Sequence, residues 1–343
     1  MVNADLHLDT LRDKMTQKLA FDEKKPYDKW KAEVKAKFLE LIGMDSIKAN
    51  ACPLNVQIEE DVKIDNYRRI RFLFDSENGC TVPCYLIVPE TGKKKYPLAI
   101  TLQGHSTGFH NSIGIPKYER DENYLPRGAF GLQAVENGFV SLCIEQRGMG
   151  EQRPVQNSRN GAAGCNYSAL NAFQMGRTLV GERIWDVSKA LDAVAETFDF
   201  VDMDKVLITG NSGGGTTSYY AACFDERIKL SAPSCAFCSY KTSIMRVPHC
   251  ACNYIPGIYD QLEMQDLACL IAPRRLLVIA GQDDGIFPLY GVKEGMETVE
   301  KIFKAAGEKD KCRLVVTPKE HWWCVDIVWP EIAKEVKAMG WEM

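Results

Sequence analysis

The 343-residue chain lacks several features that would assign it to a broad class at once. No apolar run is long enough to span a membrane, and the first fifteen residues carry scattered charges rather than the apolar core of a secretory signal. The 42 basic and 46 acidic residues are mixed along the chain, with no basic stripe and no acidic tail. These absences predict a cytoplasmic protein that binds neither membranes nor nucleic acids.

The sequence also lacks internal repeats, low-complexity tracts and the cysteine pattern of a disulfide-stapled protein. Its 13 cysteines are an odd number spread over a long chain, which indicates reduced thiols. Histidines are few: His7, His105, His110, His249 and His321. His7 falls on a predicted N-terminal helix, where a surface position is a better interpretation than catalysis.

What is present is an α/β pattern. Residues 6–43 have the apolar spacing of helices, interrupted at Pro26, and residues 54–104 read as successive strands. From residue 139 onward, apolar strands alternate with amphipathic helices, the last of them starting at about residue 330. This order predicts an α/β fold with a mostly parallel central sheet and helices on both faces. We expect residues 1–50 to form a helical extension packed on the core and residues 51–343 to form the main domain.

The segment at 206–217, VLITGNSGGGTT, carries a G-x-S-x-G motif centred on Ser212. A strand leads into the motif and a helix follows it, so Ser212 would stand at the tip of a tight strand-to-helix turn. The glycines fit because a Cβ on the neighbours would obstruct so strained a backbone. A plain glycine-rich turn would also give this pattern, but the flanking strand and helix favour a nucleophilic serine.

A serine hydroxyl needs a general base, and the base needs an acid to orient it. His321 follows the last predicted strand, RLVVTP, in a loop before the final helix. The preceding strand, RLLVIAG, is followed by Asp283 and Asp284. The chain therefore holds a serine, an acid and a histidine in that order.

With these residues in place, residues 54–343 resemble the α/β-hydrolase superfamily. The run Gly281-x-x-Asp284-x-x-Phe287-Pro288 is similar to the acid loop of many esterases in that superfamily. The resemblance implies an α/β-hydrolase fold, a lid-like insertion at about residues 235–270, and Asp284 rather than Asp283 as the orienting acid. Either aspartate could instead cap its own loop.

An oxyanion hole needs two N–H donors. One is expected to be the amide of Gly213, directly after the nucleophile. The other should come from the loop after the strand PLAITL, which reads Gln103-Gly104-His105. Superfamily members usually have His-Gly-x at this point, so the amide of His105 takes the donor position although Gln103 replaces the usual histidine. The side chains of Gln103 and His105 could line the pocket or pack inside the protein.

Four further residues are candidates for the pocket wall. Arg147 lies in a QRGMG turn that resembles acetyl xylan esterases, cephalosporin-C deacetylases and dienelactone-hydrolase-like esterases. We interpret it as a buried cation that ties loops together, with substrate contact as the alternative. The run HCACNYIPG, which begins at His249, resembles the same esterase branch and favours a pocket-wall role. Trp322 and Trp323 could flank the acyl group, stack on a sugar, or only pack.

A group of cysteines, Cys235, Cys238, Cys250 and Cys252, could bind zinc together with His249, because thiolates and imidazole are preferred zinc ligands. The second half lacks the usual C-x-x-C spacing, and cysteines are frequent throughout the chain. Buried small apolar side chains are therefore the favoured interpretation. We predict neither a metal nor a cofactor.

The resulting hypothesis is a serine carboxylesterase that removes small acyl groups, acetyl foremost, through an acyl-enzyme. Its partner would be a small-molecule or oligosaccharide ester of a carbohydrate or similar alcohol, and a homo-oligomer is left open. One alternative is a peptidase or amidase of the same fold, although the short N-terminal segment cannot form the propeller of prolyl-oligopeptidase relatives. Another is a non-catalytic zinc-binding protein, against which the complete set of triad candidates argues.

Overall fold

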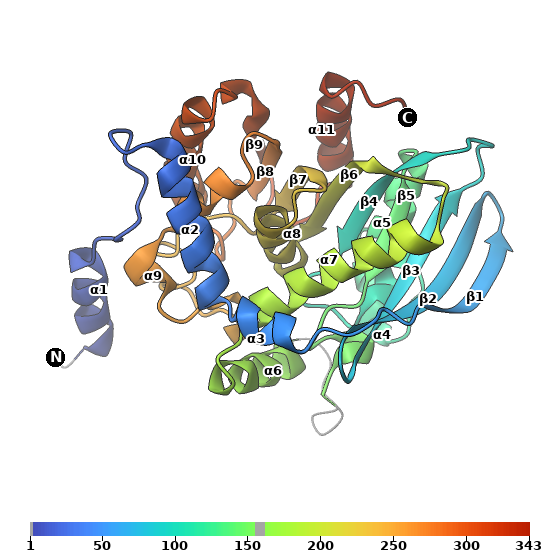
Figure 1. Cartoon of the computed structure of the whole chain (residues 1–343), viewed down its shortest axis with the longest axis horizontal. Coiled ribbons are helices and arrows are strands. Elements are labelled where there is room, and N and C mark those ends of the chain that lie inside the picture. Colours follow the sequence, from blue (N-terminus) through green and yellow to red (C-terminus); the bar gives the residue numbers. More distant parts are fainter. Residues whose placement is uncertain (1–2, 155–161) are drawn as a thin grey trace.

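The computed structural model describes residues 3–154 and 162–343, which fold around a nine-stranded sheet (Figure 1). The strands are β1 (Gln57–Ile64), β2 (Tyr67–Glu77), β3 (Cys80–Pro89), β4 (Tyr96–Leu102), β5 (Val140–Ile144), β6 (Val201–Asn211), β7 (Ile228–Ser234), β8 (Arg275–Gly281) and β9 (Cys312–Thr317). Their order across the sheet is β1-β2-β3-β5-β4-β6-β7-β8-β9. Neighbours from β1 to β5 pair antiparallel, and the remaining neighbours pair parallel. The predicted antiparallel start and mostly parallel sheet are confirmed.

The helices cover both faces of the sheet. They are α1 (Ala4–Lys14), α2 (Tyr27–Leu41), α3 (Met44–Ala49), α4 (Glu119–Tyr124), α5 (Phe130–Glu136), α6 (Ala162–Gln174), α7 (Leu179–Thr197), α8 (Gly213–Phe224), α9 (Ile258–Gln261), α10 (Leu289–Ala305) and α11 (Val325–Ala338). One apolar cluster joins α2, α7, α8 and α10 to the sheet, and a second joins α5 and α11 to it. The last helix begins at Val325 rather than near residue 330, so Pro330 lies inside it.

The two clusters arise because successive side chains of each strand point to opposite faces of the sheet. In β6, Val206 and Ile208 belong to the larger cluster, whereas Leu207 between them belongs to the cluster under α5 and α11. Successive side chains of a strand point to opposite faces, so a strand buried on both faces must be apolar almost throughout. This is why the parallel strands read as continuous apolar runs.

The two long N-terminal helices differ in how they pack. Trp30, Val34 and Phe38 of α2 are buried in the larger cluster, as their spacing predicts. The apolar residues of α1 stay in solvent, with Leu6 and Leu8 64% and 58% exposed. Figure 1 shows α1 at the edge of the molecule, away from the sheet. The apolar spacing of α1 therefore predicted a helix correctly but not its burial.

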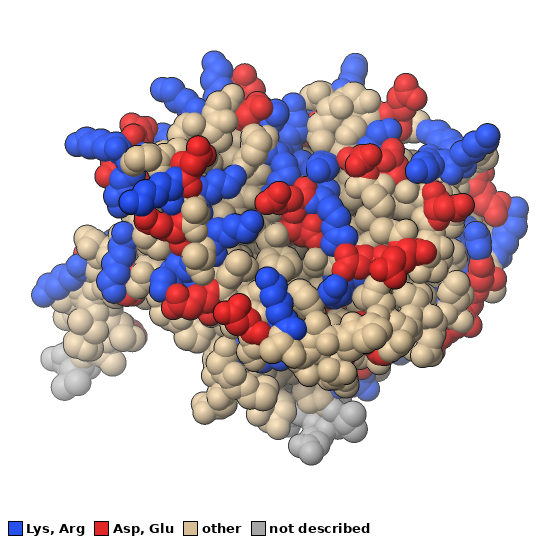
Figure 2. Space-filling model, viewed as in Figure 1, with Lys and Arg blue, Asp and Glu red and all other residues tan. Residues whose placement is uncertain are grey.

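On the face in Figure 2, Lys and Arg side chains are interleaved with Asp and Glu, without a stripe of one sign. Within residues 3–154 and 162–343, none of the helices combines the length and the apolar character that crossing a membrane requires.

The predicted site residues follow the carboxyl ends of the parallel strands. Residues 103–105 follow β4, Ser212 follows β6, Asp284 follows β8 and His321 follows β9. Loops at this edge of an open α/β sheet are where such folds usually bind their ligands.

Candidate active site

Ser212 stands in a strained turn between β6 and α8. Its backbone angles are φ 57° and ψ −125°, a region that residues with a side chain rarely adopt. The turn is held by the amide of Ser212, which donates to the carbonyl of Ser234 at 2.9 Å. A Cβ on Gly104 would lie 2.7 Å from the Asn211 carbonyl oxygen and 3.1 Å from the Cβ of Ser212. The loop after β4 can therefore approach the serine only because residue 104 is glycine.

Asp284 and His321 form a hydrogen-bonded pair. The Oδ2 of Asp284 lies 2.8 Å from the Nδ1 of His321, and the Oδ1 accepts the amides of Ile286 and Phe287 at 2.8 and 3.0 Å. Burial alone would raise the pKa of Asp284, but the hydrogen bond and charge of His321, together with the two amides, hold it below the usual value. The carboxylate is thus kept ionised and aimed at the ring.

Asp283 has a different environment. Its side chain is exposed, and its amide donates to the carbonyl of Lys319 at 3.1 Å. The ring of His321 is instead fixed by Asp284 and by a stacked contact with Phe287, with centroids 5.9 Å apart. Between the two aspartates, the structure therefore joins Asp284 to the imidazole.

Ser212 and His321 line the same cavity, which has a volume of about 430 Å³. The Nε2 of His321 is buried and has no hydrogen-bond partner among the described residues. The Ser212 hydroxyl is therefore not bonded to it in this structure. Such contacts are often long in the absence of substrate and tighten in the complex.

The amides of His105 and Gly213 are available as donors at the same cavity. Within residues 3–154 and 162–343, neither N–H group makes a hydrogen bond, and both residues line the cavity. A Cβ on Gly213 would lie 3.3 Å from the Nδ1 of His105, so the two residues are close neighbours. The side chain of His105 points its Nε2 at the sulfur of Cys252, 3.3 Å away.

His249 lines the cavity, as its sequence context suggested. Its Nε2 lies 3.1 Å from the Oγ of Ser243, and its ring meets Phe287 edge-on, with centroids 5.2 Å apart. Burial, and then the nearby charge of His321, lower the pKa of His249 to about 4. The ring is therefore neutral at ordinary pH and serves as a polar wall.

Sequence reasoning missed most of the remaining wall, which includes Tyr124, Arg127, Asn211, Pro248, Asn253, Ile286 and Phe287. Among these, Arg127 brings a cation to the cavity. Its guanidinium lies 3.6 Å from the ring centroid of Trp322 and 4.8 Å from that of Tyr124. No motif marks Tyr124, Arg127 or Pro248, whereas Asn211, Asn253 and Phe287 lie within the runs quoted above.

Two of the suggested wall residues lie outside this cavity, and their side chains make hydrogen bonds and ion pairs that stabilise the fold. Gln103 is buried, and its Nε2 donates to Ser112 Oγ and Gly128 O, both at 2.7 Å. Arg147 is buried as well; it makes a two-pronged contact with Asp186 at 2.7 and 2.8 Å and an ion pair with Glu77 at 2.7 Å. Arg147 thus ties β2 to α7, the loop-bracing role we favoured for it.

The two tryptophans beside His321 also lie outside the cavity around Ser212. Trp323 is fully buried and donates its Nε1 to the Oε1 of Gln133 at 2.9 Å. Trp322 is 43% exposed and stacks against Arg127. Trp323 therefore packs in the core, and Trp322 reaches the cavity only through the guanidinium of Arg127.

The suggested cysteine group does not come together. Cys235 groups with Asp284 and His321, whereas Cys250 and Cys252 group with Cys165 and His105. Cys238 lies apart from both groups, with its sulfur 3.3 Å from the Oγ1 of Thr242. The pairing of Cys235 and Cys238 with the later cysteines was wrong because the connection from β7 to β8 carries the two pairs to different places.

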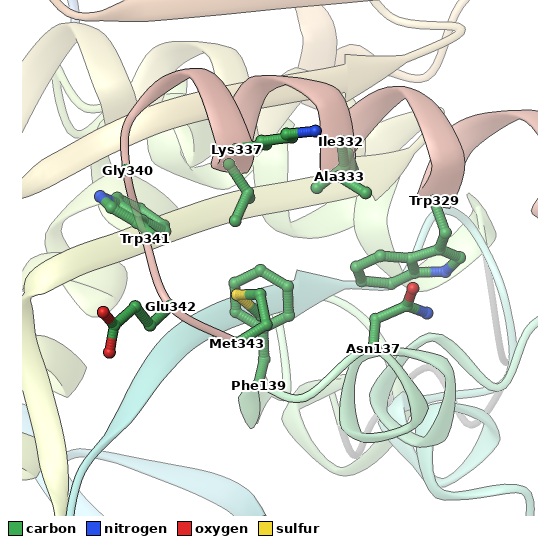
Figure 3. A pocket seen from close by; sticks show the side chains of 11 residues that line it. Asn137, Phe139, Trp329, Ile332, Ala333, Lys337, Gly340, Trp341, Glu342 and Met343 are labelled. Atoms are coloured by element: carbon green, nitrogen blue, oxygen red, sulfur yellow. The ribbon is translucent and has the colours of Figure 1, made fainter.

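A second cavity, of about 320 Å³, lies beneath α11 and is shown in Figure 3. Phe139 and Asn137, which come just before β5, face Trp329 and the C-terminal Met343 across it. It is at the amino end of β5, at the opposite edge of the sheet from Ser212. None of the predicted site residues lines it, so it is not a candidate for the active site.

The strand order and helix layers are those of the α/β-hydrolase fold. A family model described as "Abhydrolase family" matches residues 3–230, which is more than half of the chain, and the chain belongs to that family. The match includes Ser212 and ends before Asp284 and His321.

Individual proteins agree with this assignment. The chain is 25% identical over 252 residues to "Putative hydrolase YtaP" of Bacillus subtilis, a match that covers 73% of this chain and 81% of the relative. A "putative acetyl xylan esterase" from Bacteroides fragilis superposes with a TM-score of 0.77 at 14% identity, over 98% of this chain and 95% of that one. A glucuronoyl esterase from Solibacter usitatus gives a TM-score of 0.67 at 16% identity, over 95% and 99%. At these identities the two structures establish a shared fold.

Proposed function

We propose that this protein is a serine carboxylesterase that removes small acyl groups, acetyl foremost, from esters of carbohydrates or similar alcohols. The observation that carries the proposal is the hydrogen-bonded Asp284–His321 pair, whose free Nε2 borders the same cavity as the strained Ser212. Nucleophile, base and orienting acid are the three parts that acyl transfer needs.

In this mechanism the Oγ of Ser212 attacks the ester carbonyl while the Nε2 of His321 takes the hydroxyl proton. The tetrahedral intermediate collapses as His321 returns that proton to the leaving alcohol, which leaves an acyl-serine. Water then attacks the acyl-serine, again with His321 as the base, and releases the acid. Asp284 holds the Nδ1–H of His321 and stabilises the imidazolium formed in each step.

The charge that develops on the carbonyl oxygen would be met by the amides of His105 and Gly213. Both N–H groups lack partners within the described residues and border the cavity, and Gly213 begins α8, whose positive dipole end adds to the effect. Loss of one such donor typically lowers kcat by about 10²–10³-fold.

The cavity supports a small acyl group and a hydroxylated alcohol. Its volume is about 430 Å³, and Tyr124, Arg127, Asn211 and Asn253 bring polar atoms to a wall otherwise formed by rings and aliphatic groups. Hydroxyls of a sugar can bond to such groups, whereas a fatty acyl chain would need a long apolar channel. The names of the similar structures, acetyl xylan and glucuronoyl esterases, point to the same substrate class.

The test is replacement of the nucleophile. Ser212→Ala should abolish hydrolysis of p-nitrophenyl acetate and stoichiometric labelling by a fluorophosphonate probe. The matched control is Ser46→Ala, at an exposed position of α3, which should keep both. Undiminished turnover by Ser212→Ala would end the proposal.

A second assay separates esterase from peptidase activity. The enzyme should hydrolyse p-nitrophenyl acetate and acetylated xylo-oligosaccharides, and it should leave aminoacyl p-nitroanilides intact at matched concentrations. Faster turnover of the anilides would assign the same triad to amide bonds instead.

A further inference from the structure

A second group of chemically reactive side chains borders the cavity. The Nε2 of His105 and the sulfurs of Cys165, Cys250 and Cys252 all lie within 4.8 Å of one another. They come from the loop after β4, from α6, and from the 3₁₀ turn at Ala251–Asn253 and the residue before it. Cys165 and Cys252 are fully buried, and Cys250 and His105 are half-buried at the cavity wall.

Three sulfurs and one imidazole nitrogen at this spacing match a tetrahedral zinc site. Zinc binds cysteine sulfur at about 2.3 Å and histidine nitrogen at about 2.0–2.1 Å, and a Cys₃His set is a common structural combination. Ligand atoms around such an ion are separated by somewhat less than the 4.8 Å limit seen here. We propose that His105, Cys165, Cys250 and Cys252 form a zinc site that joins three distant segments of the chain.

A buried arginine supports the proposal independently. Arg183 of α7 is 3% exposed, and among the described residues its hydrogen bonds go to no carboxylate. Its guanidinium donates instead to the sulfur of Cys165 at 2.9 Å and to the carbonyl of Arg147 at 2.7 and 3.2 Å. A buried cation requires a nearby anion, because an isolated buried charge is very costly.

At least one ionised thiol is needed to balance the charge of Arg183. Zn²⁺ with three thiolates and a neutral imidazole carries a net charge of −1, which the guanidinium of Arg183 neutralises. Three protonated thiols would leave Arg183 without a counter-charge. A disulfide between two of the sulfurs would remove two of the four ligands and leave no zinc site.

The site would also hold His105 in place. Metal on the Nε2 of His105 ties the loop after β4 to α6 and to the turn at Ala251–Asn253. The amide of the same residue is one of the two oxyanion donors proposed above, so the consequence for catalysis rests on the proposed function. The metal site itself does not.

The experiment uses the whole protein, purified without a metal-binding tag and kept reduced. As purified, it should contain close to one zinc per chain by elemental analysis. After removal of the metal with a chelator, Co²⁺ should bind in the same ratio and give the intense visible bands and the near-ultraviolet thiolate charge-transfer band of tetrahedral coordination. Absence of both zinc and the cobalt spectrum would overturn the proposal.

Variants identify the ligands. Cys252→Ser and, as a second variant at a half-buried position, Cys250→Ser should each weaken cobalt binding by more than the roughly 10–100-fold typical of changes to residues that only hydrogen-bond to a ligand. Cys238→Ser is the matched control, because Cys238 is equally buried and lies outside the group, and it should bind cobalt normally. Equal binding by Cys250→Ser and Cys238→Ser, with both folded by circular dichroism, would remove the site.

Two further measurements distinguish the zinc site from the proposed esterase activity and from a disulfide. Ser212→Ala should bind cobalt like the parent protein, so loss of esterase activity and loss of metal are distinguishable. Alkylation without reduction, followed by mass spectrometry, should find Cys165, Cys250 and Cys252 all as thiols after metal removal. A disulfide between any two of them in the freshly purified protein would contradict the zinc site.

Discussion

Two sets of side chains border the cavity beside Ser212, and they are built in different ways. The Asp284–His321 pair comes from loops that directly follow two neighbouring strands, β8 and β9. The cysteine group comes from a loop, a helix and a 3₁₀ turn that are not neighbours in the sheet. Parallel strands bring their carboxyl ends together wherever they pair, so the first set follows from strand order. The second depends on how the connecting segments cross over the sheet.

The two sets also keep their charges by different means. The Asp284 carboxylate is stabilised by its partner ring and by two amides of its own loop. In the cysteine group, hydrogen bonds from Cys165 and Cys250 lower the pKa of Cys252 well below the usual value against the effect of burial, and the charge of Arg183 assists. Asp284 therefore depends on its own loop and on the ring of His321, whereas the Cys252 thiolate depends on neighbouring cysteines and on a cation supplied from α7.

The largest effect is expected on kcat when the Asp284–His321 pair is changed. Asp284→Asn should lower kcat by about 10³–10⁴-fold, because the amide can no longer hold the correct tautomer of His321. The paired change Asp283→Asn should alter kcat less than twofold, because that side chain is exposed and does not contact the ring. Steady-state kinetics with p-nitrophenyl acetate measure both. Equal losses in the two variants would contradict the assignment of the acid.

The two tryptophans beside His321 should contribute differently to the free energy of unfolding. Trp323→Ala should lower the free energy of unfolding by about 3–5 kcal/mol, because it empties a fully buried site and removes one of the two indole donors to the Oε1 of Gln133. Trp322→Ala should cost less than about 1 kcal/mol, since its ring is 43% exposed and its main partner is Arg127. Urea titrations measure both changes. A larger loss in Trp322→Ala would mean that the exposed ring carries core packing.

The proposed triad could be predicted from the sequence because each part is local. Ser212 sits in a five-residue motif with a strand before it and a helix after it, and Asp284 and His321 sit directly after apolar runs. Knowledge of the strands is then enough to place all three at one edge. The approach of Gly104 to Ser212 is likewise encoded in a residue without a Cβ.

The rest of the site could not be predicted, because it depends on long irregular connections. Nothing in the spacing of Cys165 shows that it meets Cys250, and the C-x-x-C pair at Cys235 and Cys238 suggested the wrong partners. Arg127 reaches the cavity from a loop between two short helices, α4 and α5. For α1, apolar spacing predicted the helix, but burial depends on whether the rest of the chain covers it.

The loop that carries His105 should respond to pH. Glu145, directly after β5, accepts the amides of Phe109 and Glu151 at 3.2 and 3.1 Å and so braces the loop that carries His105. Burial raises its pKa from 4.5 to about 8 despite those amides. Between these values the folded state holds a proton that the unfolded state has released. Stability should therefore fall as pH rises from about 5 to 8, by on the order of 1–3 kcal/mol, and level off above that.

Glu145→Gln should flatten this pH dependence, because the amide is neutral throughout the range. Glu151→Gln is the control and should keep the slope, since its partner Arg71 holds the pKa of Glu151 below 4.5 despite burial, outside the range tested. Urea midpoints between pH 5 and 9 measure the slopes. If the parent protein and Glu145→Gln had the same slope, Glu145 would be ionised in the fold.

The smallest effect is expected at Arg127, which borders the cavity without belonging to either set. Its Nε is buried and has no hydrogen-bond partner among the described residues, and burial lowers its pKa, so the guanidinium has unused capacity to bind a substrate. Arg127→Met should raise KM for an acetylated oligosaccharide about fivefold, roughly 1 kcal/mol, and leave kcat unchanged. Arg120→Met, at an exposed position of α4, is the control.

With p-nitrophenyl acetate the same change should have no effect, because that ester has no sugar to contact the guanidinium. A fall in kcat with both substrates would place Arg127 at the reacting atoms, beside the Asp284–His321 pair. Weaker cobalt binding in Arg127→Met would couple it instead to the cysteine group. Arg127 belongs neither to the Asp284–His321 pair nor to the cysteine group, so we expect Arg127→Met to leave both unaffected.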